Sequence, residues 1–266
     1  MQVAGKRRRI FVKIAALMTA PANPIVIIPA RLAATRLPDK PLADIAGTPL
    51  IVRIWRCAVG ADVGRVVGAC GDAGIKAAIE AAGGEAVMTD PDLPSGSDRV
   101  AAAAETLDPE GAHDVVVNLQ GDVPEIDSAT LRAVLTPLAH PEYQMSTVAT
   151  LMDPSLRDDP NSVKVVLALA DGAAVGRALY FSRATVPSGD GPLYHHFGLY
   201  AFRRAALRQF VSLPPGSLET RERLEQLRAM EAGIPIGVAL IDRPLREVNT
   251  PEDLERERSL LADSPD

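Results

Sequence analysis

The sequence predicts an α/β protein with a mainly parallel sheet, and two observations carry this prediction. First, apolar and β-branched runs such as residues 25–28 (IVII) and 114–119 (DVVVNL) are typical of strands buried on both faces of a sheet. Second, amphipathic segments with helix start and stop signals alternate with these runs. Because two parallel strands joined by a helix form one βαβ unit, the alternation predicts a doubly wound core flanked by helices.

The first half of the chain shows this alternation most clearly. We predict strands at residues 25–28, 65–70, 85–88 and 114–119, and helices at residues 49–58, 75–82, from 95 onward and 127–138. Pro49 suits the start of the first helix, and the Gly83-Gly84 pair ends the second. Asp127 or Ser128 can cap the last of them.

The second half of the chain is less regular. We predict strands at residues 145–152, 162–169, 177–182, 197–202 and 236–241, separated by turns rich in Pro and Gly. Such turns indicate antiparallel or mixed additions to the sheet. One helix is predicted at residues 218–232, where Gly233 ends it, and a last helix begins at Thr250 with Pro251 in its first turn.

No internal repeat or low-complexity linker divides the chain. We therefore expect one domain over residues 25–262, with residues 1–24 as a disordered N-terminal extension. Lys13 interrupts the apolar run of this extension, which argues against a signal peptide, and Met18 is the expected natural start. The extension is also too short to span a membrane, and no other stretch of the sequence suits a transmembrane helix.

Composition argues against several classes of protein. A chain of 266 residues with 47% hydrophobic residues can bury one large core. The formal net charge of −6 argues against nucleic acid as the main partner, because binding to a phosphate backbone needs a basic face. Cys57 and Cys70 lack the spacing of a zinc site or a disulfide framework, which favours a reducing cytoplasm.

The loop after the first predicted strand concentrates positive charge. Residues 29–41 present Arg31, Thr35, Arg36 and Lys40, with few large apolar side chains. Loops at the carboxyl end of strands bind ligands in open α/β sheets, and this set of side chains favours a polyphosphate. A solvated basic loop without a ligand is the alternative. Neither glycine-rich phosphate motif occurs, so these side chains would do the work of the backbone amides in such motifs.

Two further segments carry polar groups at the ends of predicted elements. Asp122 follows the strand at residues 114–119 and is expected beside the basic loop, where a carboxylate suits Mg²⁺ together with substrate phosphates. The alternative is an acid that only turns the loop. Residues 95–99 offer amides, hydroxyls and the Arg99 guanidinium to a base or a phosphate, or they only cap a helix.

Eight motifs, in order along the chain, resemble one family. They are IPAR-x(4)-RLP-x-KPL at residues 28–42, SGSDR at 95–99, NLQGD at 118–122, PNSVKVV at 160–166, ALYFSRATVP at 178–187, HFGLYAF at 196–202, LEQLR at 224–228 and NTPEDLE at 249–255. Each motif alone is modest evidence, and their order makes the set specific. Together they resemble the 3-deoxy-manno-octulosonate (KDO) cytidylyltransferases, also called CMP-KDO synthetases.

The resemblance implies a fold and an activity. It implies a Rossmann-like nucleotide-diphospho-sugar transferase fold, with a mixed, mostly parallel sheet flanked by helices. Members of that family transfer CMP from CTP to the anomeric hydroxyl of KDO, release pyrophosphate, need Mg²⁺ and supply lipopolysaccharide assembly. They are cytoplasmic homodimers, and the resemblance puts the dimerisation and sugar-binding elements within about residues 140–235.

The resemblance assigns the nucleotide side of the site to Arg31, Arg36, Lys40, Ser97, Arg99, Gln120 and Asp122, and Thr35 is added from its place in the basic loop. The loop residues bind the phosphates, and Arg36 and Lys40 stabilise the departing pyrophosphate. Ser97 and Arg99 lie near the cytosine. Asp122 becomes a Mg²⁺ ligand.

The resemblance assigns the sugar side to Arg183, His196, Tyr200, Glu225 and Gln226, with Gln120 between sugar and nucleotide. An acidic sugar needs a cation for its carboxylate and hydrogen-bond partners for its hydroxyls, and these side chains supply both.

Three features depart from the family: Asn249, Cys70-Gly71 where the family has a Thr-Asp motif, and Val123 where a Glu is common. Where the family usually has an Asp as second Mg²⁺ ligand, this chain has Asn249, and an amide oxygen carries no charge. We therefore expect weaker metal binding. Two alternatives stay open: a cytidylyltransferase for a related acidic sugar such as an amino-KDO or a sialate, and a degenerate protein that binds CTP without releasing pyrophosphate.

Overall fold

The structure is a computed structural model that describes residues 21–33 and 37–262. Within these ranges one sheet contains β1 (Pro24–Ala30), β4 (Arg65–Cys70), β5 (Glu85–Met88), β6 (Val115–Asn118), β7 (Met145–Leu151), β8 (Lys164–Ala168), β9 (Val175–Ser182), β10 (Tyr194–Arg203) and β11 (Ile236–Leu240). The strand order is β5-β4-β1-β6-β10-β7-β11-β9-β8, with a further pairing between β10 and β8. A separate hairpin joins β2 (Asp44–Ile45) to β3 (Thr48–Pro49).

The sheet has two halves of different character. In the parallel half, β5, β4, β1 and β6 all run in the same direction. In the mixed half, β10 runs antiparallel to β6, β7 and β8, while β11 is parallel to β7 and antiparallel to β9. The parallel half corresponds to the predicted doubly wound core, and the mixed half to the predicted additions.

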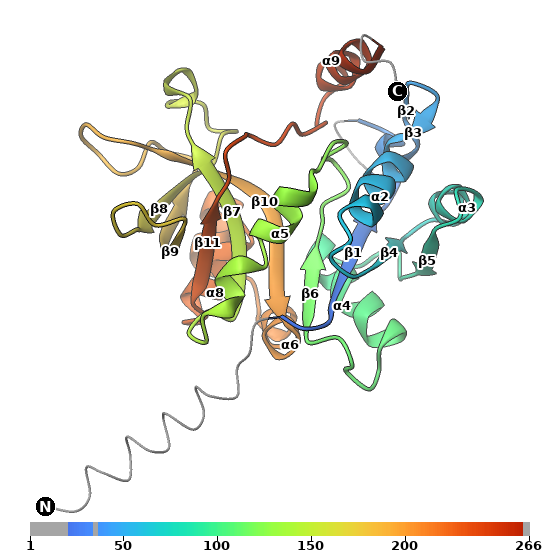
Figure 1. The fold of residues 1–266 in the computed structure, drawn as a ribbon, viewed down its shortest axis with the longest axis horizontal. Coiled ribbons are helices and arrows are strands. Elements are labelled where there is room, and N and C mark those ends of the chain that lie inside the picture. Colours follow the sequence, from blue (N-terminus) through green and yellow to red (C-terminus); the bar gives the residue numbers. More distant parts are fainter. Residues whose placement is uncertain (1–20, 34–36, 263–266) are drawn as a thin grey trace, which may run out of the picture.

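Helices cover both faces of the sheet (Figure 1). The helices are α2 (Leu50–Gly60), α3 (Ala73–Ala81), α4 (Gly96–Leu107), α5 (Ser128–Ala133), α6 (Arg204–Ser212), α7 (Ser217–Glu222), α8 (Gln226–Glu231) and α9 (Pro251–Ala262), with short 3-10 turns η1 (Lys40–Leu42), η2 (Thr136–Ala139) and η3 (Pro154–Leu156). Successive residues of β1 point to opposite faces. Val26 and Ile28 pack with α2, α3 and α5, whereas Ile25 and Ile27 pack with α4, α6 and α8.

The first half of the chain follows the predicted pattern closely. The strands at residues 65–70 and 85–88 have the predicted bounds, and α2, α3 and α4 occur where predicted. The Asp127 carboxylate caps α5 by accepting a hydrogen bond from the Thr130 amide at 2.6 Å. The helix predicted over residues 127–138 is split into α5 and η2.

The second half contains two corrections. The single helix predicted over residues 218–232 is wrong, because Arg223 adopts a left-handed backbone conformation (φ 56°) and separates α7 from α8. Helix α6 was not predicted. It follows β10 directly, without a Gly or Pro between them, and its first residue is preceded by Arg203, whose side chain makes no cap hydrogen bond.

The folded unit begins before residue 25, the boundary predicted from sequence. The backbone amides of Ala22 and Asn23 each donate to the Asp114 carboxylate at 2.9 Å. The prediction for the rest of the extension, including Met18, lies outside the described residues.

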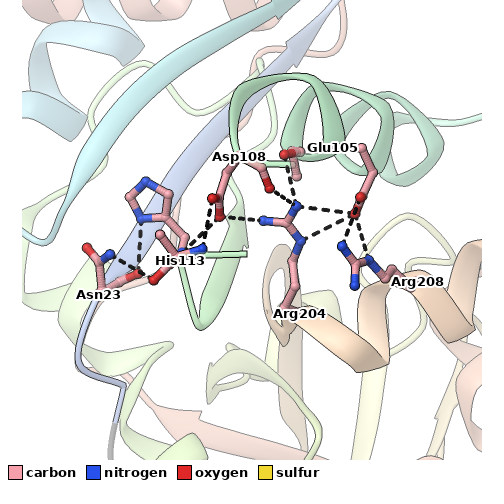
Figure 2. A network of polar contacts seen from close by, with 8 residues as sticks. Asn23, Glu105, Asp108, His113, Arg204 and Arg208 are labelled. Atoms are coloured by element: carbon pink, nitrogen blue, oxygen red, sulfur yellow. Dashed lines mark hydrogen bonds and ion pairs between the residues drawn. The ribbon is translucent and has the colours of Figure 1, made fainter. Parts of the chain in front are cut away.

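A partly buried polar network lies at the amino end of β1, where α4, α6 and residues 22–23 meet (Figure 2). Arg204 on α6 donates to the Asp108 carboxylate at 2.8 Å, and Asp108 also accepts the amides of Ala112 and His113 at 2.8 Å each. The His113 ring lies 3.1 Å from the Asn23 carbonyl oxygen. The network therefore connects α6 of the mixed half to α4 and the start of β1.

At the opposite end of the central strands, residues 241–250, hereafter the strap, lead from β11 over the top of the sheet to α9 (Figure 1). The Val248 amide donates to the Asp122 carbonyl oxygen at 2.8 Å and so fixes the strap to the end of β6. Every helix in the described ranges is too short or too polar to span a bilayer.

Candidate active site

Two adjoining cavities open at the carboxyl ends of the parallel strands. The first, of about 180 Å³, is lined by Pro29, Ala30, Arg31, Lys40, Pro41, Ser95, Gly96, Arg99, Gln120, Gly121 and Asp122. The second, of about 800 Å³, is bounded by β10, the loop at residues 161–163, the start of α8 and the strap. Gln120 and Asp122 line both cavities. A ligand in one cavity would therefore meet a ligand in the other at the end of β6.

The basic loop after β1 reaches the first cavity through two of its predicted residues. Arg31 is exposed, and its Nη1 lies 3.5 Å from the Leu93 carbonyl oxygen. Lys40, at the start of η1, lies at the boundary of the first cavity with the strap. The roles predicted for Thr35 and Arg36 lie outside the described residues.

The Lys40 ammonium is surrounded by oxygen atoms. Its Nζ lies 2.8 Å from the Val248 carbonyl, 3.4 Å from Asn249 Oδ1 and 3.6 Å from Asp122 Oδ2. A carboxylate, an amide oxygen and a backbone carbonyl are ligand types that a hard divalent cation prefers. No group of three or more His, Cys, Asp or Glu side chains that could hold a metal occurs in the described ranges. This donor set would therefore need oxygens from a bound phosphate to complete a metal site.

Asn249 has a defined orientation. Its Nδ2 donates to Glu247 Oε2 at 3.0 Å, which turns Oδ1 toward Lys40. Sequence reasoning missed Glu247, although residues two apart in an extended chain point to the same side. Glu247 lines the second cavity with Asn249.

Ser97 and Arg99 lie on α4, which begins as predicted with Ser95 as its cap. Arg99 is 2% exposed and donates to Thr89 Oγ1 at 2.5 Å, and to the carbonyls of Asp90 at 3.0 Å and Pro91 at 3.1 Å. Burial lowers the pKa of the Arg99 guanidinium, and Arg31 lowers it further. Arg99 thus shapes the first cavity by holding the loop at residues 89–91.

A hydrogen-bonded chain leads from the junction of the cavities to α8. Gln120 Nε2 donates to Asn118 Oδ1 at 2.9 Å, and Asn118 Nδ2 donates to Ser97 Oγ at 3.1 Å. Ser97 Oγ in turn donates to Glu225 Oε1 at 2.5 Å. Ser97 was predicted to bind the nucleotide and Glu225 the sugar, but in the structure the two side chains bind each other. Neither is among the described residues that line the two cavities. Burial raises the pKa of the Glu225 carboxyl group.

Strand β10 supplies two predicted sugar ligands to the second cavity. His196 Nε2 lies 3.0 Å from Thr147 Oγ1, and burial, with a smaller effect of His195, lowers the pKa of His196 to about 3. The His196 imidazole is therefore neutral near pH 7. Burial also raises the pKa of Tyr200, which keeps its hydroxyl protonated as a hydrogen-bond donor.

Gln226 and Arg183 both line the second cavity but differ in how far their hydrogen-bond donors are satisfied. Gln226 is 2% exposed, and its Nε2 has no hydrogen-bond partner among the described residues. The Arg183 guanidinium donates to the carbonyls of Glu222 at 2.9 Å, Pro160 at 2.9 Å and Arg223 at 3.4 Å. An unpartnered buried donor is unfavourable unless a ligand satisfies it, whereas Arg183 is largely committed to the protein backbone.

Several residues of the second cavity were not predicted. They include Asn161, Ser162, His195, Arg246, Glu247, Arg256 and Glu257. Glu257 is 2% exposed and its Oε1 accepts from Arg246 Nε at 2.7 Å, so this pair fixes the strap to α9. Tertiary structure alone brings these residues together.

Known proteins of similar sequence are cytidylyltransferases by name. The family described as "Cytidylyltransferase" matches residues 25–240. A protein of Rhodospirillum centenum named 3-deoxy-manno-octulosonate cytidylyltransferase is 58% identical over 92% of this chain and 96% of its own length. A protein of Paramagnetospirillum magneticum with the same name is 56% identical over 91% of this chain and 99% of its own length.

Solved structures show the same likeness. A CMP:2-keto-3-deoxy-manno-octonic acid synthetase, solved in complex with CTP, is 34% identical and superposes with a TM-score of 0.82, covering 91% of this chain and 99% of its own. A cytidylyltransferase of Leptospira borgpetersenii superposes with a TM-score of 0.59 at 16% identity, covering 92% of this chain and 88% of its own, and shows the fold alone.

Proposed function

Since this chain belongs to the 3-deoxy-manno-octulosonate cytidylyltransferase family, we propose that it transfers CMP from CTP to the anomeric hydroxyl of KDO. The products are CMP-KDO and pyrophosphate. The reaction is a nucleotidyl transfer that serves lipopolysaccharide biosynthesis.

The observation that carries this proposal is the pair of cavities that share Gln120 and Asp122. The first cavity offers the cations Arg31 and Lys40, which suit the phosphates of CTP. The second offers Tyr200 and the Gln226 amide, whose Nε2 has no partner in the part of the chain that the structure describes, and both suit sugar hydroxyls. A donor and an acceptor substrate placed in the two cavities would react at the end of β6.

The transfer asks the protein mainly to position the substrates and to neutralise charge. The anomeric oxygen of KDO forms a bond to the α-phosphorus of CTP, while the bond from that phosphorus to the oxygen leading to the β-phosphate breaks. The hydroxyl proton is released, and pyrophosphate leaves with the bonding electrons. Lys40 would stabilise the departing charge, and no protein nucleophile is needed.

The oxygen atoms around Lys40 also suit Mg²⁺, the cofactor that we propose. Asp122 and Asn249 would hold it together with the substrate phosphates, and Lys40 would then move toward the phosphates. A bound Mg²⁺ would neutralise triphosphate charge and lower the pKa of the sugar hydroxyl.

We also propose that the protein is a cytoplasmic homodimer. Support comes from two exposed leucines within the predicted dimerisation range, Leu151 on β7 (65% exposed) and Leu179 on β9 (44% exposed). Light scattering of the purified chain measures the oligomeric state, and a monomer at micromolar concentration would overturn this part of the proposal.

Pyrophosphate release tests the proposed activity. We expect release from CTP and Mg²⁺ only when KDO is present. Sialate and an amino-KDO, tested in parallel, measure the preference for the sugar. No release with KDO at high Mg²⁺, while CTP still binds, would show that the protein acts on another sugar or has lost its chemistry.

A further inference from the structure

A fully buried lysine lies behind the wall of the second cavity. Lys164, the first residue of β8, is 0% exposed. It pairs with Ser182 on β9 and with His195 on β10, so three strands enclose it. Its burial contrasts with Lys40 and Lys76, the other lysines in the described ranges, which keep partly exposed side chains.

The Lys164 ammonium binds backbone oxygens. Its Nζ donates to the Asp159 carbonyl at 2.7 Å and to the Arg183 carbonyl at 3.3 Å, and it forms no ion pair within 4 Å among the described residues. Burial lowers the pKa of Lys164, an effect that Asp159 and Asp158 partly oppose. A buried charge is costly, and an apolar side chain of similar volume often gives a more stable protein. Stability alone therefore does not explain why a lysine occupies this position.

Of the two carbonyls that Lys164 binds, one belongs to Arg183, which lines the second cavity, and the other to Asp159, which precedes the lining residues Asn161 and Ser162. Asp159 orders the turn that follows it, because its carboxylate accepts the Asn161 amide at 2.9 Å and the Ser162 hydroxyl at 3.1 Å. Arg183 donates to the Pro160 carbonyl at 2.9 Å, within the same turn. Asn161, Ser162 and Arg183 all line the second cavity. Lys164 thus fixes this turn and the Arg183 backbone to each other.

The charge of Lys164 also reaches the cavity. His195 lines it, and the pKa of His195 is lowered by burial and then by Lys164. A positive charge behind this wall favours an anionic ligand in the cavity, because low-dielectric surroundings screen it little.

We propose that Lys164 is a positioning residue for the acidic sugar: it fixes the turn at residues 159–162 against Arg183 and places a positive charge behind the sugar cavity. The inference rests on the proposed function, since it assigns KDO to the second cavity. Lys164 acts without touching the sugar, because its side chain is shielded from the cavity.

Steady-state pyrophosphate release by the full chain tests this proposal. For Lys164→Met we expect the KM for KDO to rise about tenfold or more, because the turn and the charge are both lost. The KM for CTP should change less than about twofold, because the first cavity is formed by other elements. Lys164→Gln, which keeps a donor, is measured in parallel and should show a smaller increase. Lys164→Arg, which keeps charge and donors, should recover much of the affinity for KDO.

Arg204→Met is the matched control, because Arg204 is also a buried cation but lies in the network of Figure 2. It should lower the melting temperature without changing the KM for either substrate. An unchanged KM for KDO in Lys164→Met, or an equal rise in both KM values, would overturn the inference. If Lys164→Met does not fold, the KM for KDO of Lys164→Gln decides in the same way. If the wild type releases no pyrophosphate with KDO, the proposed function itself fails, whatever the variants do.

Discussion

The two halves of the sheet differ in what they bury. The strands of the parallel half are almost wholly apolar inside, and Asn118 at the end of β6 is the polar exception among their buried residues. The mixed half buries Thr147, Lys164, Ser182 and His196 within its strands. Its polar groups are therefore part of the sheet, whereas those of the parallel half lie on loops at its edge. If each cavity binds one substrate, as we propose, CTP binds to loops on an apolar scaffold and KDO binds against a polar sheet interior.

The residue at the junction of the two halves should give the largest effect. Asp122→Asn removes a charge that lies in both cavities, so we expect kcat/KM to fall about 1000-fold. Initial rates with each substrate varied measure it, with exposed Asp44→Asn as the control for loss of one acid. A fall in kcat/KM of less than tenfold, or a changed KM for one substrate only, would contradict the placement of Asp122 between the two substrates.

The network in Figure 2 joins the two halves of the sheet through α4 and α6, at the amino end of β1. Arg204→Met leaves the buried Asp108 carboxylate without its cation, so we expect about 3 kcal/mol less unfolding free energy in urea. Arg208→Met should have no measurable effect, because the Arg208 side chain is 52% exposed and its pair with Glu105 is screened by solvent. Equal losses of unfolding free energy in the two variants would show that burial of Arg204 is not what stabilises this contact between α6 and α4.

The buried histidine of the mixed half makes stability depend on pH. The His196 pKa is lowered from 6.5 to about 3, so between these values the unfolded chain binds more protons than the folded protein. Unfolding free energy should therefore fall as pH decreases through this window, and from about pH 7 to about pH 5 the contribution is about 2 kcal/mol.

His196→Gln should remove this contribution, whereas His140→Gln, at an exposed position, should keep it. Urea unfolding at the two pH values measures the difference. The same pH dependence in wild type and His196→Gln would show that His196 is not held neutral.

The break between α7 and α8 should give the smallest effect. Arg223 has φ 56°, a conformation that glycine adopts without strain, so we expect Arg223→Gly to raise the unfolding free energy by about 0.5–1 kcal/mol. Arg221→Gly, within α7, should instead lower it by about 1 kcal/mol. A loss of stability in Arg223→Gly would contradict the reading of this break as local strain.

The sequence predicted the parallel half better than the mixed half for a physical reason. Strands β4 and β5 are bounded by turns and helices with Gly signals, so pattern alone fixed their ends. In the mixed half, Arg223 breaks a helix without a Gly at the break, and α6 follows β10 without a boundary signal. Local pattern carries no information about such changes.

The residues of the candidate site also divide into some that local sequence predicts and others that only the fold brings together. The cations of the basic loop could be predicted as ligand-binding residues, because they directly follow an apolar strand and loops at that position often bind ligands. The bond between Ser97 and Glu225 could not, since these residues are 128 positions apart. The burial of Lys164 and of the Gln226 Nε2, which has no partner within residues 21–33 and 37–262, could not be predicted either, because both result from tertiary packing.

We propose that each half of the sheet binds one substrate, and a crossed measurement of KM values tests this assignment. Lys40→Met changes the first cavity, and Gln226→Leu changes the second. We expect Lys40→Met to raise the KM for CTP about tenfold and leave that for KDO within about twofold. Gln226→Leu should do the reverse, about tenfold for KDO. If both variants raise the same KM, or each raises both equally, the assignment of the two substrates to the two halves is contradicted.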